Sequence, residues 1–272
     1  MSVRGNWVTV CGQQIRVEVR SADDAHQDPP LVLCNGIGAS LETFDPLVAG
    51  LDSRRTVVSF DVPGAGLSPA PRLPYTFPIL ALTIARMLTR LGYPRFDVLG
   101  YSWGGALAQQ LAFQFPHRCA RVILMCTATG MLMVPARPKV LWHMSTPRRY
   151  RDPDYAAQVA PVIYGGAARR DLDGVREVFG TVETRASRRG YAYQLLAGAG
   201  WTSLPFLPLI RQPVLVLAGD DDPIIPLVNA RTMRRLLPHA ELSVFPGGHI
   251  DPLLRSDDIG SRIETFLNHE RH

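Results

Sequence analysis

A serine flanked by glycines stands where a buried strand gives way to a helix. The stretch GYSWGG (100–105) follows the apolar run FDVLG and precedes ALAQQLAF, whose apolar residues have helical spacing. In a turn this tight, side chains two positions either side of Ser102 would clash, so glycine is needed there. The motif predicts a strand–turn–helix unit that presents the Ser102 hydroxyl above a sheet, near a helix N-terminus that favours negative charge. The alternative is a serine that only caps the helix.

Short apolar runs recur along the rest of the chain and predict further strands. The first two alternate in polarity, as antiparallel edge strands do, whereas the later ones are continuously apolar, as strands covered on both faces must be. Helical patterns over 80–91, 108–115 and 259–266 lie between or after these runs. Strand–helix alternation of this kind predicts an α/β fold with a mostly parallel sheet flanked by helices. The predicted strands are 7–10, 15–20, 31–35, 56–60, 96–101, 121–126, 213–219 and 241–245.

The alternation breaks between residues 128 and 205. This stretch is rich in Pro, Gly and Arg and has no clear buried strand, so we expect an inserted, mostly helical cap (lid). The core is then formed by residues 1–127 and 206–272. A chain of 272 residues suits one large domain that carries such an insertion.

Composition excludes several other classes of protein. The net charge of +5 is too small to indicate nucleic-acid binding without a concentrated patch. No run approaches the roughly 18 apolar residues of a membrane span, and the N-terminus lacks the apolar core of a secretory signal. We therefore expect a cytoplasmic protein with no transmembrane segment. The four cysteines lack C-x-x-C spacing and no nucleotide-binding or metal-ligand motif is present, so the sequence predicts no cofactor and no metal.

A serine hydroxyl is a weak nucleophile unless a base accepts its proton and an acid orients that base. After a G-x-S-x-G turn, the acid is expected after a later strand. The run GDDDPIIP (219–226) follows such a strand and holds three aspartates. In sequences with such a G-x-S-x-G turn, the acid commonly stands four residues before a proline. Here that proline is Pro226, which favours Asp222. Asp220 is the second choice and Asp221 the third, and the alternative is that all three cap the following helix.

The base is expected last in the chain, after the final strand. His249, in LSVFPGGHIDP, follows the predicted strand 241–245 and a Gly-Gly loop. It is the one histidine at the expected place, so we assign it as the base. The other histidines are His26, His117, His143, His239, His269 and His272.

Charge that develops on a tetrahedral intermediate needs backbone N–H donors, which together form an oxyanion hole. One donor is expected from Trp103, directly after the nucleophile. The other is expected from Ile37 in NGIGAS (35–40), where Gly36 and Gly38 allow the backbone to turn. A plain glycine-rich turn is the alternative.

Beyond these residues, longer stretches resemble the intracellular depolymerases of medium-chain-length poly(3-hydroxyalkanoates). The resemblance implies an α/β-hydrolase fold with Ser102 as nucleophile, Asp222 as acid and His249 as base. It also implies a serine hydrolase that cleaves the ester bonds of this polyester, or of its oligomers, through an acyl-enzyme. After His249 the chain has IDPLL, where the family is more apolar. The stretches that carry the resemblance are NGIGASLE, FDVPGAG, ARML, SWGGALAQQ, MVPARPKVLW, PRRY, IYGG, GWTS and LAGDDDPIIPL.

Two other functions fit parts of the same pattern. A general carboxylesterase or lipase acting on monomeric acyl esters would use the same three residues. A hydrolase-like protein that binds a ligand without turnover is the more remote alternative, and its usual mark, a missing member of the triad, is not found here. The sequence leaves the oligomeric state and the preferred acyl length open.

The whole positive surplus of the chain lies in the predicted cap. Residues 130–203 hold eleven Lys and Arg against six Asp and Glu, and the remainder holds eighteen of each. One interpretation is a solvated, arginine-rich face. The other is a surface that docks on an anionic support, such as a coated storage granule, and brings the site to an insoluble substrate.

Overall fold

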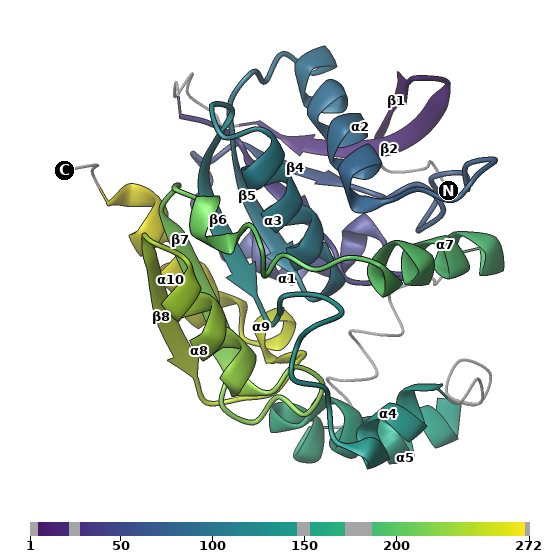
Figure 1. Ribbon diagram of the computed structural model, residues 1–272, viewed down its shortest axis with the longest axis vertical. Coiled ribbons are helices and arrows are strands. Elements are labelled where there is room, and N and C mark those ends of the chain that lie inside the picture. Colours follow the sequence, from purple (N-terminus) through teal and green to yellow (C-terminus); the bar gives the residue numbers. More distant parts are fainter. Residues whose placement is uncertain (1–4, 22–27, 146–152, 172–186, 270–272) are drawn as a thin grey trace.

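An eight-stranded sheet forms the centre of the chain (Figure 1). The structure is a computed structural model that describes residues 5–21, 28–145, 153–171 and 187–269. The strand order is β1-β2-β4-β3-β5-β6-β7-β8; β1 and β2 are antiparallel to their neighbours, and all later pairings are parallel. The predicted antiparallel edge and parallel centre are confirmed. The strands are β1 (Asn6–Val10), β2 (Gln13–Arg20), β3 (Leu31–Cys34), β4 (Val57–Phe60), β5 (Phe96–Tyr101), β6 (Cys119–Met125), β7 (Val214–Gly219) and β8 (Ala240–Phe245).

Helices follow the predicted patterns, with ends that differ by a few residues. Helix α2 begins at Phe77 rather than near Leu80, because Pro78 fits the first helical turn, where no backbone N–H is needed. Helix α3 begins at Trp103, directly after the serine turn. The α-helices are α1 (Asp45–Ala49), α2 (Phe77–Arg90), α3 (Trp103–Gln114), α4 (Pro138–Ser145), α5 (Pro153–Tyr164), α7 (Arg188–Ala199), α8 (Leu227–Leu236), α9 (Asp251–Leu254) and α10 (Ser256–Asn268). Three 3₁₀ turns are η1 (Leu41–Phe44), η3 (Gly166–Arg169) and η4 (Leu207–Leu209).

Both faces of the sheet are buried under helices. Successive strand side chains point to opposite faces, so Val98 packs in the core beneath α2, α3 and α8, and Leu99 packs in the core beneath α1, α9 and α10. In Figure 1, α3 lies in front of the sheet and α1 behind it. The continuously apolar strand sequences are explained by this two-sided burial.

A helical insertion leaves the sheet after β6 and returns before β7. Its two ends meet at a short neck, where the Met131 amide donates to the Trp201 carbonyl (2.8 Å) and the Ser203 amide to the Thr129 carbonyl (2.9 Å). Between these ends come α4, α5, η3 and α7, and Figure 1 shows α4 and α5 projecting beyond the sheet, apart from α7. In its described part, the segment between β6 and β7 carries these helices and no named strand. Within the described ranges, every helix is too short or too polar to cross a lipid bilayer.

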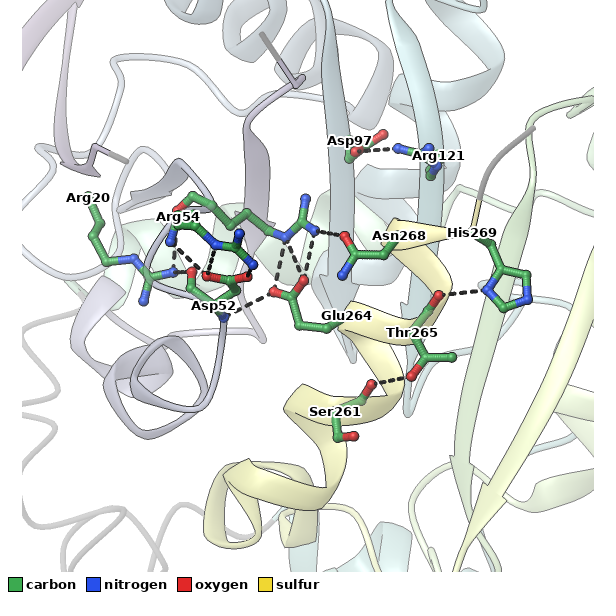
Figure 2. Close-up of polar contacts among 11 residues, drawn as sticks. Arg20, Asp52, Arg54, Asp97, Arg121, Ser261, Glu264, Thr265, Asn268 and His269 are labelled. Atoms are coloured by element: carbon green, nitrogen blue, oxygen red, sulfur yellow. Dashed lines mark hydrogen bonds and ion pairs between the residues drawn. The ribbon is translucent and has the colours of Figure 1, made fainter. Parts of the chain in front are cut away.

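A nearly buried ion pair attaches the last helix to the loop before β4. Arg55 donates to both carboxylate oxygens of Glu264 (2.7–3.1 Å) and to Asn268 Oδ1 (2.9 Å). The Arg55 and Glu264 side chains are only 7% and 14% exposed. Figure 2 shows Glu264 and Asn268 on the side of α10 that faces the loop carrying Asp52. This bidentate contact holds α10 against the sheet at the edge opposite the serine turn.

Replacement of Glu264 by alanine should destabilise the fold without changing the chemistry at Ser102. Removing Glu264 leaves the buried Arg55 guanidinium without its hydrogen-bonded carboxylate, which costs about 3 kcal/mol. We expect this loss of unfolding free energy in urea titrations. The control is Asp258→Ala on the same helix, which removes a more exposed carboxylate (39%) and should cost about 0.5 kcal/mol. Equal losses of unfolding free energy in the two variants would show that the ion pair between Arg55 and Glu264 does not stabilise the fold in this way.

Candidate active site

Ser102 occupies a strained turn between β5 and α3. Its φ of 53° and ψ of −120° lie outside the regions that side-chain-bearing residues normally adopt. A Cβ at Gly100 would come within 2.4 Å of the Gly104 carbonyl oxygen, and one at Gly104 within 2.1 Å of the Cys34 carbonyl oxygen. The two glycines are therefore required by close backbone packing, as the motif predicts. The Thr127 hydroxyl donates to the Ser102 carbonyl oxygen (2.7 Å) and braces the turn.

His249 lies in the loop between β8 and α9, directly beside Ser102. Its Nε2 is 3.0 Å from Ser102 Oγ, and its Nδ1 is 2.7 Å from Asp222 Oδ2. The His249 and Asp222 side chains are only 6% and 1% exposed. An ionised Asp222 accepts the Nδ1 proton, which leaves Nε2 free to accept the serine proton. The structure thus brings together the three residues assigned from the sequence, in the order that nucleophilic catalysis needs.

The main chain of His249 is held as firmly as its ring. Its amide donates to the Tyr164 carbonyl oxygen (2.8 Å), and its carbonyl oxygen accepts the Tyr101 hydroxyl (2.9 Å). The Tyr101 ring also packs on the imidazole, with 5.3 Å between ring centroids. These contacts restrict the ring to one place without using its nitrogens.

The three consecutive aspartates have three different partners. One oxygen of Asp222 accepts a hydrogen bond from His249 Nδ1. The other oxygen accepts hydrogen bonds from the amides of Ile224 and Ile225 (both 2.9 Å). Asp220 accepts the Gly247 amide (3.0 Å), and Asp221 forms an ion pair with Arg169. None of the three caps α8, whose N-cap residue is Pro226. The geometry favours Asp222, the first choice from the sequence.

Asp221 connects the loop after β7 to the insertion, near the protein surface. It accepts from the Gly166 amide (2.8 Å) as well as from Arg169. Partial burial opposes its ionisation, but these hydrogen bonds outweigh that effect and hold the pKa of its carboxyl below the ordinary value. Its carboxylate therefore faces the insertion and does not contact the imidazole.

The loop after β3 lies against the serine turn, as an oxyanion hole requires. A Cβ at Gly36 would be 3.7 Å from Ser102 Cβ. Asn35 holds the loop, because its Oδ1 accepts the Gly36 amide (2.8 Å) and its Nδ2 donates to the Ser40 carbonyl oxygen (2.6 Å). Among the described residues, no acceptor is found for the amides of Ile37 and Trp103. Both assigned donors are thus free to bind a developing oxyanion.

Gln194, on α7 of the insertion, is a site residue that the sequence did not indicate. Its side chain is fully buried, and its Oε1 accepts the amide of Gly38 in the loop after β3 (2.7 Å). Its carbonyl oxygen accepts Trp103 Nε1 (3.0 Å). Its neighbours in YAYQLLAG (191–198) form no recognisable motif, so no local pattern marks it.

Cys126, at the end of β6, completes the buried surroundings of the acid. Ligand atoms of Cys126, Asp222 and His249 all lie within 4.8 Å of one another. Two ligands on one tetrahedral zinc are roughly 3.3 Å apart, whereas His249 Nδ1 and Asp222 Oδ2 are 2.7 Å apart. This spacing is that of a hydrogen-bonded pair. Burial, reinforced by the Asp222 carboxylate, raises the pKa of the Cys126 thiol, so the thiol stays neutral beside the acid.

Comparison with known proteins shows the family to which the chain belongs. Residues 29–256 match the family described as alpha/beta hydrolase fold. The chain belongs to the α/β-hydrolase family. It is 46% identical to the poly(3-hydroxyalkanoate) depolymerase of Ectopseudomonas oleovorans over 97% of this chain and 92% of that protein, which confirms the resemblance seen in the sequence.

The similarity extends to more distantly related proteins. The 3-oxoadipate enol-lactonase 2 of Acinetobacter baylyi is 25% identical over 95% of this chain and 96% of that protein. The crystal structure of the enol-lactonase from Burkholderia xenovorans superimposes with a TM-score of 0.82 at 24% identity, over 97% of this chain and all of that one. At this identity, the likeness of structure shows the α/β-hydrolase fold alone.

Substitution of the three aspartates by asparagine should separate their roles. Asp222→Asn should lower kcat by about 10³–10⁴-fold, because the imidazole loses the partner that sets its tautomer. Asp220→Asn and Asp221→Asn should change kcat little, since their oxygens bind an amide and an arginine away from the imidazole. The measurement is steady-state hydrolysis of a soluble ester. A severe loss in Asp220→Asn with a mild one in Asp222→Asn would overturn the assignment.

Proposed function

We propose that this chain is a serine ester hydrolase that cleaves poly(3-hydroxyalkanoate) polyester or its oligomers through an acyl-enzyme. The observation that carries the proposal is the continuous chain of hydrogen bonds from Asp222 through His249 to Ser102. The 46% identity to a poly(3-hydroxyalkanoate) depolymerase supports the choice of substrate class.

In this proposal each step of the reaction is assigned to a residue. Ser102 Oγ attacks the ester carbonyl carbon as His249 Nε2 removes the serine proton, and the amides of Ile37 and Trp103 bind the negative oxygen. Protonated His249 then delivers its proton to the leaving alcohol, leaving an ester between the acyl group and Ser102. Water, deprotonated by the same nitrogen, hydrolyses that ester and restores the serine. Asp222 holds the imidazole and stabilises its positive form in both halves.

Exposed apolar side chains are concentrated in the insertion, which favours an apolar substrate such as a polyester. In this proposal residues 1–127 and 206–272 form the hydrolase core and residues 128–205 form its cap. Half of the fourteen large apolar side chains exposed in the described parts of the chain lie in this 78-residue cap. Trp142, on α4, is 71% exposed, whereas Trp201 is buried in the core beneath α3. The exposed apolar residues of the cap are Met131, Leu132, Val134, Leu141, Trp142, Leu195 and Leu196.

The proposed nucleophile is tested by Ser102→Ala. This variant removes only the attacking oxygen, so ester hydrolysis should fall by at least about 10³-fold while the circular dichroism spectrum is unchanged. The substrates are amorphous granules of a medium-chain polyester and short p-nitrophenyl esters, assayed side by side. A folded Ser102→Ala protein with near wild-type turnover would overturn the mechanism.

The same pair of substrates separates the alternatives for the wild-type protein. Release of 3-hydroxy acids from granules supports a depolymerase. Turnover of p-nitrophenyl esters alone indicates a carboxylesterase or lipase acting on monomeric esters. Turnover of neither substrate indicates a hydrolase-like binding protein.

We further propose that the cap's positive charge brings the protein to the surface of an anionic storage granule. Six cap cations are described and all are exposed, whereas two cap acids, Asp154 and Asp171, are described. The six are Arg137, Lys139, Arg169, Arg170, Arg188 and Arg189. The remaining cap charges lie outside the described residues: Arg148, Arg149, Arg151, Asp152, Asp173, Arg176, Glu177, Glu183 and Arg185.

Salt should therefore affect granules and soluble substrate differently. Exposed charges are screened over about 10 Å at 0.1 M salt, so binding to native granules in a sedimentation assay should weaken as salt rises. Hydrolysis of a small soluble ester by the same preparation should scarcely change. Equal salt sensitivity in both assays, or none in the granule assay, would favour the simpler interpretation of a solvated arginine-rich face.

A further inference from the structure

The insertion contacts the histidine loop around the end of α5. Gly165 and Gly166 have φ of 66° and 48°, and their backbone packs against the backbone of both loops that carry the acid and the base. A Cβ at Gly165 would lie 2.1 Å from the Asp221 carbonyl oxygen, and one at Gly166 would lie 2.1 Å from the Gly248 nitrogen. No other residue type fits this junction without moving the chain.

One buried carboxylate joins the two sides of this junction. Asp251 is only 1% exposed, and its Oδ2 accepts the Gly248 amide (2.9 Å) from the histidine loop. The same oxygen accepts the Ala167 amide (3.0 Å) from η3 of the insertion. Its Oδ1 is buried, with no hydrogen-bond partner in the described part of the chain. Removing this carboxylate would leave two amides without their acceptor, one of them that of Gly248, the residue before the base.

The neighbouring contacts show why this position matters for the base. The His249 amide donates to the Tyr164 carbonyl oxygen of the same insertion segment, two residues before Gly166. Tyr164, at one end of the segment 164–167, binds the His249 amide directly. Ala167, at the other end, is joined to the Gly248 amide through Asp251. Asp221 holds the Gly166 amide as well, but its side chain is 40% exposed and its carboxylate does not bind the histidine loop.

We propose that Asp251 is a positioning residue for His249, through which the insertion holds the catalytic base in reach of Ser102. The role rests on the proposed function of His249 as the base. The carboxylate acts as a hydrogen-bond acceptor for two amides, not as a charge acting on the imidazole. Displacement of a catalytic group by about 1 Å can lower the rate by roughly 10²-fold, so loss of this acceptor should affect the chemical step.

The test compares Asp251→Ala with Asp251→Asn. The asparagine keeps an oxygen that can accept both amides, so its kcat for a soluble p-nitrophenyl ester should stay close to that of the wild type. Asp251→Ala should lose about tenfold or more in kcat, with KM unchanged. Asp257→Ala, which removes an exposed carboxylate six residues further on, is the control and should match the wild type.

Rates are expressed per active site, counted by the end point of labelling with a reactive organophosphonate, so unfolded protein does not lower them. A purely structural role would lower the melting temperature of Asp251→Ala and leave kcat per labelled site unchanged, and that result would overturn the proposal. An Asp251→Asn variant as slow as Asp251→Ala would also overturn it. A wild-type protein that neither labels nor hydrolyses any ester would instead refute the proposed function itself.

Hydrogen exchange of backbone amides tests the proposal in the wild-type protein, without any substitution. Because one buried oxygen holds both amides, Gly248 and Ala167 should be protected from exchange to a similar degree. Rapid exchange at both positions would show that Asp251 does not hold the junction, and would overturn the proposal.

Discussion

The close packing of α3 against the ends of β3 and β5 is the constraint on which the site depends. Gly104 lies on the Cys34 carbonyl and Gly100 lies under the first turn of α3, so the chain has room for one sharp turn between strand and helix. That turn places Ser102 at φ 53° with its hydroxyl above the sheet. It also leaves the first amide of α3, that of Trp103, pointing out of the helix without an intrahelical acceptor. The proposed nucleophile and the proposed anion donor are therefore both positioned by this one turn.

Parallel strands bring the remaining groups to the same edge of the sheet. The loops after β3, β7 and β8 carry Ile37, Asp222 and His249, and all leave the sheet at the carboxyl ends of their strands. The amino ends of the strands serve stability instead, through the clamp between Arg55 and Glu264. Chemistry and anchoring are thus placed at opposite edges of the sheet.

The insertion also supports this site at two points. Gln194 on α7 binds the loop that carries Ile37, and the segment from Tyr164 to Ala167 binds the loop that carries His249. Both contacts are hydrogen bonds at partly buried positions, and their loss would leave a backbone amide without its acceptor. An insertion attached in this way connects the loop after β3 and the loop after β8 through its own backbone and side chains.

Local patterns were enough to predict the strands, the parallel sheet and the residues around Ser102. Strands that are buried on both faces are continuously apolar in sequence, so they can be recognised directly. A tight turn requires glycine whatever surrounds it. The choice of Asp222 among three aspartates also came from local spacing, and the observed hydrogen bonds agree with it. The apolar pattern predicts a start near Leu80, three residues after the observed start of α2 at Phe77. Pro78 in the first turn interrupts the apolar pattern without interrupting the helix.

The sequence by itself therefore determined the α/β architecture, the serine turn and the place of the histidine after the last strand. Only the tertiary structure decided which distant groups meet there: Gln194 with Gly38, Tyr164 with His249, and Asp251 with Ala167. These pairs are joined through backbone amides and carbonyls, which every residue carries. An amide leaves no mark in the residue type of its partner, so only the folded arrangement of the chain reveals the contact.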